Sequence, residues 1–432
     1  MRELLAGILG GRVPQGETPT YRTILDLGTE QTKALVVQSR GPESVILGAG
    51  RSRHERHVSH MGGAPIDVPA MVRSCDRALR QAEDMTERCC EHQVVPDWVV
   101  VGVPDCLTAA RTHTVTHRRS HPSQRITEGE LADVAKRAQR LALRELGDKV
   151  SARLGGPGTR LALLEARLTA IRVDGRSVTS PVGLQGEKVT VTVLNVVVPA
   201  SYLDVVEAVV AQLGLDILDV RSSWQALASA TIGKRAICID LGGSTTDFML
   251  VQNGEPRATA TVALGGRDFT AQLAKALTLS ERDAERLKLA YCLGQLDQHL
   301  ADTVLAAVDR LIGVWVGAME SAVGTLCGSE ELPRQFSLWG GGSGMPCVVE
   351  AVLSFPWAER LGCSGNPEVR LMRPELIPGV LDGTGQVRDQ EYACPMAVAG
   401  HSAWRASAAT DWDPFLWAVK RPAAFVDRGA GN

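Results

Sequence analysis

Hydrophobic residues are concentrated in residues 236–251, which have the sequence AICIDLGGSTTDFMLV. Apolar runs without regular polar interruption are typical of strands that are buried on both faces of a sheet. Asp240 ends the first run and Asp247 begins the second, on either side of Gly242 and Gly243. The pattern therefore predicts two buried strands joined by a tight glycine turn, with a carboxylate at each end of the turn.

The residues of this turn suit a phosphate group and its cation. Because glycines have no side chain, the backbone N–H groups of the turn can approach an anion closely, and Ser244, Thr245 and Thr246 add hydroxyl donors. Mg²⁺ usually binds one or two carboxylates together with phosphate oxygens and water, so Asp240 and Asp247 are expected to hold it through water. For this motif alone, a surface hairpin with a Gly-Gly turn is an alternative of equal weight.

A second copy of the pattern occurs near the start of the chain. Residues 21–38, YRTILDLGTEQTKALVVQ, contain an apolar strand that ends at Asp26, a turn with Gly28 and Thr29, and a second apolar strand at 34–37. Two phosphate hairpins in two halves of one chain predict a nucleotide held between two similar domains.

A third glycine-rich loop follows the second hairpin by about a hundred residues. Residues 336–348, FSLWGGGSGMPCV, contain Gly340, Gly341, Gly342 and Ser343, where an adenine and a ribose could lie against bare backbone. The three motifs, in this order, resemble those of the superfamily of actin, the DnaK chaperones and the sugar kinases. Its motifs are DxG[TS], DxGG[GS]T and an adenosine loop.

The resemblance implies an α/β protein with the actin-like two-domain ATPase fold. It also implies that the cofactors are ATP and Mg²⁺, with the ion held by Asp26, Asp240 and Asp247 through water. The two hairpins and the adenosine loop are then the main parts of the nucleotide site.

Composition agrees with a large protein that contains several domains. A chain of 432 residues can bury two or more cores, and a net charge of -3 gives no reason to expect nucleic acid binding. The ten cysteines show no CxxC spacing, which favours reduced thiols over a disulfide framework. No apolar run approaches the roughly 18 residues that span a bilayer, and the short apolar segment at the N-terminus contains Glu3, so neither a membrane span nor a signal peptide is expected.

Helical periodicity appears at 1–9 and at 66–87. The first of these helices could lie on a membrane surface, but packing on the protein body is the preferred interpretation. His54, His57 and His60 stand at a spacing of three, yet no carboxylate or cysteine supports them as metal ligands, so a metal site is not expected there.

Residues 96–186 are interpreted as an inserted α+β domain. Its expected elements are strands at 98–104, 111–118 and 162–173, a helix capped by Thr127 and Glu130, and the turn SPVGLQG at 180–186. Pro- and Gly-containing turns at both boundaries suggest a separable domain, used for contacts between subunits or with other proteins, whose deletion leaves ATP binding intact. Its basic cluster is interpreted as a solvated loop rather than a site for an anionic partner; the cluster consists of His113, His117, Arg118, Arg119 and His121.

The position of this insert and the turn at 180–186 resemble FtsA, the actin homologue of bacterial cell division, and its pilus relative PilM. The likeness covers roughly residues 20–400. It implies that Gly265 and Gly266 continue the nucleotide site and that Glu285 and Lys288 reach the ribose and adenine. The expected domains are 1–95 with 187–232, the insert 96–186, a second actin-like domain 233–400 with a reduced subdomain at about 270–330, and a tail 401–432.

The resemblance implies an ATP-binding scaffold that links division proteins near the inner face of the membrane, at most a slow ATPase. Its partners would be FtsZ or other division proteins, and self-association into filaments is a further expectation. The location would be cytoplasmic or peripheral at the plasma membrane. A PilM-like cytoplasmic adaptor of a type IV pilus or secretion machine is the alternative, and a small-molecule kinase of the same superfamily is a less favoured one.

Four departures from the family pattern affect these expectations. Glu30 and Gln31 stand in the first phosphate loop, where negative charge would weaken ATP binding, and Trp339 replaces a small polar residue beside the adenosine loop. The chain after Tyr291 enters a long helix at 296–323 without the small sheet that bears the FtsZ-tail surface in FtsA. The C-terminal segment 411–421 is a short candidate for a membrane-docking helix, so membrane contact is left open.

Overall fold

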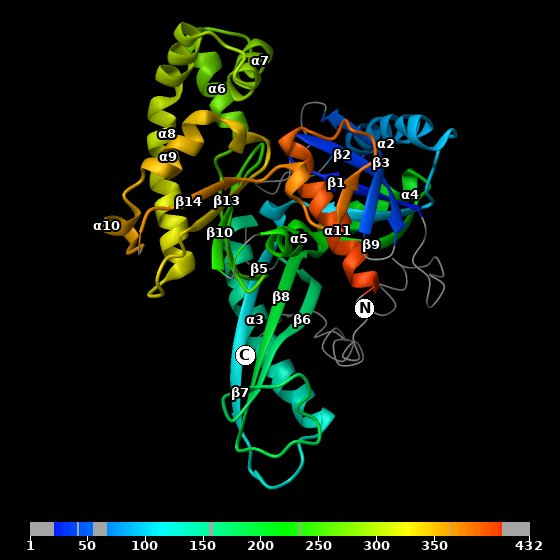
Figure 1. Cartoon of the computed structure of the whole chain (residues 1–432), viewed down its shortest axis with the longest axis vertical. Coiled ribbons are helices and arrows are strands. Elements are labelled where there is room, and N and C mark those ends of the chain that lie inside the picture. The colour runs from blue at the N-terminus through cyan, green and yellow to red at the C-terminus, as the bar shows by residue number, and fades with distance from the viewer. Residues whose placement is uncertain are drawn as a thin grey trace, which may run out of the picture.

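The computed structural model describes residues 21–40, 43–54, 67–154, 159–231, 233, 235–363 and 365–407, without the side chains of 149, 151–154 and 402–407. The expected helices at 1–9 and 411–421, as well as His57 and His60, lie outside these ranges. Two lobes stand side by side, and an arm extends below them (Figure 1). Each lobe is organised around one sheet, and the arm prolongs the second.

The first lobe has a six-stranded sheet in the order β15-β3-β2-β1-β4-β9. Strands β1 to β3 are antiparallel, whereas β4 and β9 continue the sheet parallel to β1. The strands are β1 Tyr21–Leu27, β2 Gln31–Arg40, β3 Glu43–Arg53, β4 Trp98–Val103, β9 Asp216–Ser222 and β15 Val380–Asp382.

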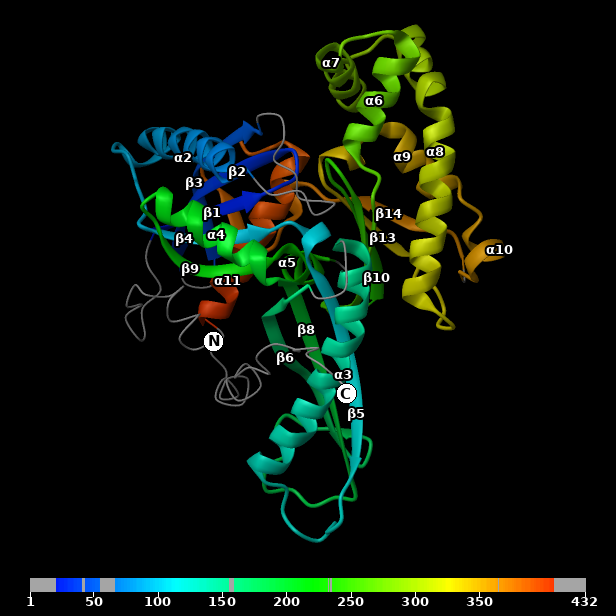
Figure 2. The ribbon, with the colours of Figure 1, turned by 180° about the vertical axis from the view of Figure 1, so that it is seen from behind.

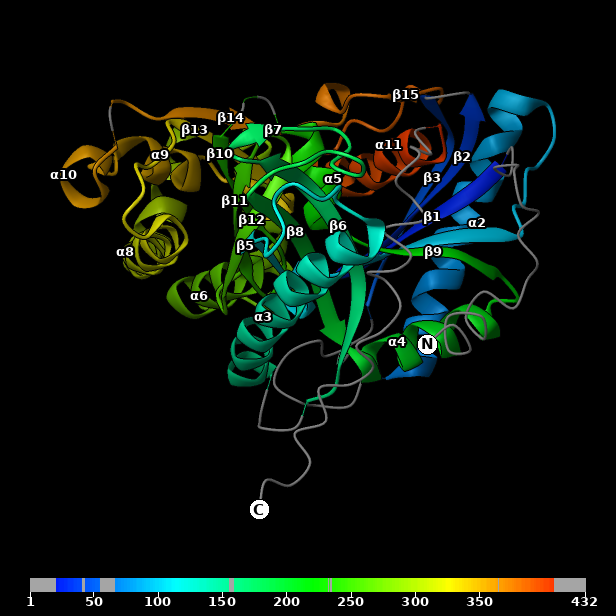
Figure 3. The ribbon, with the colours of Figure 1, turned by 90° about the horizontal axis from the view of Figure 1, so that it is seen from below.

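Both faces of this sheet are covered by helices, which explains its nearly continuous hydrophobicity. In β2, Ala34 and Val36 face one core, and the alternate residues Leu35 and Val37 face another. Helices α2 (Val68–Cys90) and α4 (Ala200–Gln212) cover the first face, and α11 (Ala393–Ser407) covers the second (Figure 3).

The second lobe repeats this strand arrangement. Strands β10, β11 and β12 are antiparallel, and β13 and β14 continue parallel to β10. The strands are β10 Arg235–Leu241, β11 Thr246–Gln252, β12 Glu255–Val262, β13 Gln335–Trp339 and β14 Glu368–Leu371. The repeat supports the interpretation of the two phosphate hairpins as equivalent parts of two similar domains.

Helices of the second lobe lie mainly above and outside its sheet (Figure 1). They are α6 Gly266–Leu277, α7 Glu281–Cys292, α8 Gln298–Cys327, α9 Pro346–Ser354 and α10 Trp357–Leu361. Alternate residues of β10 again face two cores: Ile237 and Ile239 pack toward α8, whereas Cys238 joins a core with α11 and α5 (Ser223–Ala230). One core cluster therefore contains residues of both sheets and connects the two lobes.

The arm contains three long strands, one two-residue strand and a long helix. Its elements are β5 Ala109–Arg118, α3 Glu128–Leu154, β6 Leu161–Val173, β7 Arg176–Ser177 and β8 Lys188–Pro199. Figure 2 shows the helix α3 alongside β5, β6 and β8. β5 joins the second sheet through the pair Ala258 and Arg111, and Thr112 Oγ1 donates to the carbonyl of Pro256 at 2.6 Å. The arm is thus fastened to the second lobe as well as to the first.

These elements differ from the expected boundaries of the insert at 96–186. The segment 98–103 is β4, a central strand of the first sheet, because its apolar residues pair parallel with β1. The segment 188–199 is β8, which pairs with β5 and β6 in the arm. Continuous apolar runs do not reveal which sheet a strand joins, so the sequence pattern could not separate these assignments.

The upper part of the second lobe is helical where the chain passes from α7 to α8. α7 ends at Cys292 and α8 begins at Gln298, and the described residues between them form no strand. Val304, Val308, Trp315 and Met319 of α8 are buried, as their helical spacing predicts. No described helix is both long and apolar enough to cross a bilayer.

Candidate functional site

A cavity of about 1530 Å³ lies between the two lobes. Fourteen of the sequence-predicted site residues line it: Asp26, Gly28, Thr29, Asp240, Gly242, Gly243, Thr245, Asp247, Gly266, Glu285, Lys288, Gly340, Gly341 and Gly342. They come from both hairpins, from the helices above the second sheet and from the third glycine loop. The fold therefore brings together segments that are more than 300 residues apart in the chain.

The other four predicted residues stand behind this lining. Thr246 is buried, where its hydroxyl donates to the carbonyl of Leu264 at 2.7 Å and accepts from Trp315 Nε1 at 2.9 Å. Gly265 precedes α6, and a Cβ there would lie 2.5 Å from the amide nitrogen of Thr245. Ser244 and Ser343 hold neighbouring loops in place through the contacts described below.

The first hairpin places an ion pair at its turn. Asp26 and Lys33 are opposite each other in the β1–β2 register, and Lys33 Nζ lies 2.9 Å from Asp26 Oδ2. Burial would lower the pKa of Lys33, but the charge and hydrogen bond of Asp26 outweigh it and raise this pKa. Lys33 was missed in the sequence, although the tight hairpin register was a signal that could have identified it.

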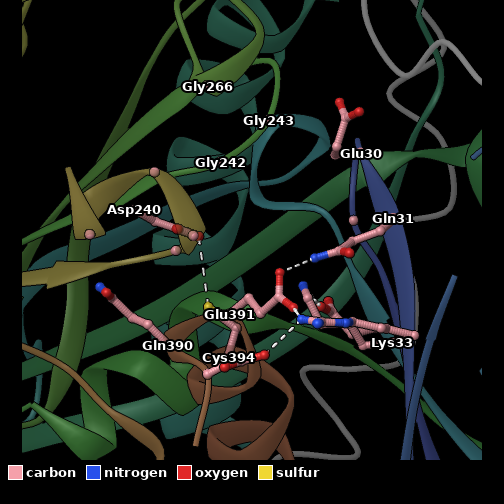
Figure 4. A pocket seen from close by; sticks show the side chains of 18 of the residues that line it. Glu30, Gln31, Lys33, Asp240, Gly242, Gly243, Gly266, Gln390, Glu391 and Cys394 are labelled. Carbon is pink, nitrogen blue, oxygen red and sulfur yellow. Dashed lines mark hydrogen bonds and ion pairs between the residues drawn. The ribbon is translucent and has the colours of Figure 1, made fainter. Parts of the chain in front are cut away.

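The second hairpin places two carboxylates opposite each other, Asp240 on β10 and Asp247 on β11. Asp247 accepts hydrogen bonds from Thr245 Oγ1 at 2.8 Å and Thr261 Oγ1 at 2.6 Å, which fix its orientation. Asp240 Oδ1 is buried and has no hydrogen-bond partner, while its Oδ2 receives only a long contact of 3.9 Å from Cys394 Sγ (Figure 4). Burial, and then the charge of Asp247, raise the pKa of Asp240 to about 7.

The third loop runs close to the end of β10. Gly340 has φ 77°, and a Cβ there would lie 2.1 Å from Asp240 Oδ1. A Cβ at Gly342 would lie 1.7 Å from a methyl group of Leu241. Ser343 Oγ donates to the carbonyl of Gly340 at 2.7 Å and accepts from Gln390, so the loop is held in a bend that exposes backbone to the cavity.

The cavity wall above the second sheet carries a bonded pair of opposite charges. Lys288 Nζ lies 2.7 Å from Glu285 Oε2 and donates to the carbonyl of Gly266 and to Thr270 Oγ1, both at 3.0 Å. Burial would raise the pKa of Glu285, but Lys288, Thr270 and Arg53 together lower it. The wall thus presents a fixed charged pair beside Gly266.

Several polar contacts cross the cavity from one lobe to the other. The amide of Ser244 donates to Thr29 Oγ1 at 3.2 Å, and Arg267 donates to the carbonyl of Thr29 at 2.9 Å. Arg267 also pairs with Glu30, and Arg53 pairs with Glu285 at 2.9 Å. Glu30 is therefore partly neutralised by an arginine whose position the sequence pattern did not predict.

A further set of contacts joins the first hairpin to the segment before α11. Gln31 donates to Glu391 (Figure 4). Arg51 pairs with both Glu391 and Asp389. Gln31 thus contributes to the cavity rim rather than occupying the turn alone. None of these residues has a local sequence signal, because each partner lies more than 300 positions away.

Two interpretations from the sequence, one of the histidines near residue 54 and one of the basic cluster in the insert, can be compared with the structure. His54 Nε2 lies 2.8 Å from the carbonyl oxygen of Gly28, and no cluster of three metal-ligating side chains occurs among the described residues. Arg119, expected in a solvated loop, is buried: its guanidinium contacts Glu130 at 2.6 and 3.1 Å and three backbone carbonyls. That expectation is wrong for Arg119, which fixes the turn at the end of the arm.

Comparisons with known proteins agree with the motifs. A family model described as "Cell division protein FtsA" matches residues 237–397. The chain is 24% identical over 356 residues to cell division protein FtsA of Bacillus subtilis, covering 75% of this chain and 74% of that protein. It is 24% identical over 367 residues to FtsA of Neisseria meningitidis serogroup B, covering 76% and 80%.

A solved structure supports the fold. The PilM-PilN type IV pilus biogenesis complex contains a chain that matches with a TM-score of 0.59 and 16% identity, covering 89% of this chain and 98% of that one. The resemblance to FtsA and PilM is confirmed, and the fold is the actin-like ATPase fold.

Proposed function

We propose that this chain binds ATP with Mg²⁺ in the cavity between its lobes and acts as an FtsA-like scaffold in bacterial cell division. The observation that carries the proposal is Asp240, whose buried Oδ1 has no protein partner at the point where two glycine hairpins face one cavity. A buried carboxylate without a partner is costly unless a ligand satisfies it. The similarity to FtsA proteins supports the division role.

The cavity residues fit this cofactor. The backbone of Gly28–Thr29 and of 242–245 would receive the phosphates, and Asp26, Asp240 and Asp247 would orient the water shell of the ion. Among the described residues, no three metal-ligating side chains lie close enough together to hold an ion directly. Binding of Mg²⁺ to the aspartates through water is consistent with this arrangement. Glu285 and Lys288 would contact the ribose and adenine, which lie along Gly340, Gly341 and Gly342.

Bound ATP supplies phosphate charges and a divalent cation in the space between the lobes. The contacts that connect the first hairpin to the second lobe across that space include those of Thr29 and Glu30 with Ser244 and Arg267. A ligand that contacts both hairpins would therefore change the free energy of closing the lobes. We infer that the nucleotide controls conformation or self-association, so that the chain acts as a switchable scaffold near the membrane.

The proposal is tested by titrating a fluorescent ATP analogue with and without Mg²⁺. Wild type is expected to bind with Mg²⁺, and Asp240→Ala is expected to lose at least tenfold in affinity. Asp302→Ala, an exposed acidic residue on α8 away from the cavity, is the matched control and should bind as wild type does. Equal binding of Asp240→Ala and wild type would show that the cavity assignment is wrong.

A PilM-like adaptor is the second candidate, favoured because the chain passes from α7 to α8 through a short turn that contains no strand. The apolar side of α8 offers little new groove, because Val304, Val308 and Trp315 are buried. We expect the FtsZ tail peptide of the same organism to bind with a Kd above roughly 100 μM, about 5 kcal/mol of binding free energy. Low micromolar binding would contradict this and favour an ordinary division role, whereas undetectable binding would favour the adaptor.

A further inference from the structure

Asp105, a buried aspartate that belongs to none of the three motifs, lines the same cavity. Asp105 begins a short 3₁₀ helix, Asp105–Leu107, immediately after β4 and Pro104. β4 runs parallel to β1, and Gly102 is the register partner of Asp26. Because parallel strands end at the same edge of a sheet, Asp105 is placed at the edge where the first hairpin turns.

The backbone of Asp105 is firmly held, but its side chain is not satisfied. The amides of Leu107 and Thr108 close the 3₁₀ turn at 3.0 Å each, and Thr108 Oγ1 also donates to the carbonyl of Asp105 at 3.2 Å. The residue is 6% exposed, and neither carboxyl oxygen accepts a hydrogen bond of normal geometry. Burying an acid without hydrogen-bond partners is unfavourable, so the position of Asp105 beside the cavity points to a ligand that satisfies it.

Two of the three motif aspartates have more defined surroundings. Asp26 is paired with Lys33, and Asp247 is fixed by two threonines. No described side chain donates a hydrogen bond to either carboxyl oxygen of Asp105. In the part of the chain that the structure describes, no three metal-ligating side chains lie close enough together to hold a metal ion directly. Asp105 is therefore better placed to bind a small neutral molecule than to act as a direct metal ligand.

The environment also makes Asp105 a strong proton acceptor once it is ionised. Burial, followed by the charges of Asp240, Asp247 and Asp26, raises its pKa well above the usual value. The amide of Trp224 acts in the opposite direction and is the weakest of these influences. A cation bound beside the same aspartates would offset their charge.

We propose that Asp105 holds the water molecule that attacks the terminal phosphate of ATP, and accepts its proton. This inference rests on the proposed function. In the reaction, the water oxygen forms a bond to the γ-phosphorus, and the bond from that phosphorus to the β,γ-bridging oxygen breaks. The bonding electron pair leaves with ADP, one water proton passes to the Asp105 carboxylate, and inorganic phosphate is the second product. The proton then returns to solvent, so that no other reactant is needed.

The experiment compares binding with turnover in Asp105→Asn and Asp105→Ala. We expect both variants to bind the fluorescent ATP analogue with Mg²⁺ within about threefold of wild type. We expect phosphate release from ATP in single turnover to fall at least about 100-fold, the lower range for loss of a general base. Formate added to Asp105→Ala should restore part of the rate, because it can replace the missing carboxylate.

Asp97→Asn is the matched control, since Asp97 is an exposed aspartate that immediately precedes β4, at its opposite end. It should bind and hydrolyse ATP as wild type does. Far-UV circular dichroism of each variant checks the fold, and formate rescue distinguishes a missing proton acceptor from a purely structural loss. If Asp105→Ala is unfolded, Asp105→Asn, which keeps the side-chain volume, decides the question.

The outcomes separate this inference from the function on which it rests. Failure of wild type to bind ATP with Mg²⁺ would overturn the proposed function and the inference with it. Binding by wild type without phosphate release, or release by Asp105→Asn at the wild-type rate, would overturn the role of Asp105 and leave ATP binding intact. Normal binding, lost release and formate rescue together would support it.

Discussion

Replacing Asp240 by asparagine should stabilise the ligand-free protein at alkaline pH, although it should weaken ATP binding. The carboxyl group of Asp240 is buried, and its pKa is raised from 3.8 to about 7 by burial and by Asp247. The folded protein therefore keeps a proton that the unfolded chain releases between these two values. Because the unfolded state binds fewer protons in this window, stability falls as pH rises through it and levels off above about pH 7.

The size of the effect follows from the pKa difference. A difference of one in pKa between the folded and unfolded states corresponds to about 1.4 kcal/mol of stability. The pKa of Asp240 differs by about 3, so its ionisation destabilises the folded protein by about 4 kcal/mol above pH 7. Between pH 5 and pH 8 the folded protein loses about 2–3 kcal/mol of stability, which is somewhat more than half of the total. Asparagine cannot ionise; its own buried amide costs roughly 1–3 kcal/mol, but that cost is the same at both pH values.

The assay is urea unfolding of wild type and Asp240→Asn at pH 5 and pH 8 without nucleotide. The stability of the variant relative to wild type should increase by about 2–3 kcal/mol between the two pH values. Asp302→Asn, an exposed carboxylate on α8, serves as control and should change by less than about 1 kcal/mol. A constant difference between Asp240→Asn and wild type at both pH values would refute the reasoning. Saturating ATP with Mg²⁺ should stabilise wild type more than the variant.

Three further predictions concern the hairpins and the arm. Gly243→Val should lower ATP affinity at least tenfold in a titration with labelled ATP, because its Cβ would lie 2.8 Å from Glu30 Cβ and push the hairpins apart; unchanged affinity would contradict this. Glu30→Gln should tighten ATP binding up to about fivefold at low salt, since it removes a negative charge and releases Arg267, an exposed pair worth up to about 1 kcal/mol; weaker binding would oppose this reasoning. Deleting 96–186 should give insoluble protein, because it removes β4 and most of the arm while leaving β8, and soluble protein that binds ATP would show that the segment is separable after all.

The sequence predicts the hairpins well because their information is local. Apolar runs, a carboxylate at the strand end and adjacent glycines lie within residues 236–251, and the structure places a tight antiparallel pair there. The long helix α8 is similarly evident from its helical period, and Val304, Val308, Trp315 and Met319 are among its buried residues. Leu305 of the same helix is 38% exposed.

Other features depend on partners that are distant in the chain. β4 and β8 are both continuous apolar strands, and only their pairing distinguishes a strand of the first sheet from a strand of the arm. Arg267 neutralises Glu30 from the other lobe. Asp105 follows an ordinary buried strand, and its importance appears only when the fold leaves its two oxygens without partners beside the cavity.

The charges of the cavity explain why ATP and the cation are expected to bind together. Asp26, Asp105, Asp240 and Asp247 line this space, and the ammonium group of Lys33 is already paired with Asp26. ATP alone would bring further negative charge toward Asp240 and Asp247, where the low dielectric of a buried site strengthens repulsion. Arg53 and Arg267 do not offset this repulsion at the hairpins, because they are already paired with Glu285 and Glu30. A divalent cation between the phosphates and these aspartates turns the repulsion into attraction, so the affinity for ATP should depend steeply on Mg²⁺.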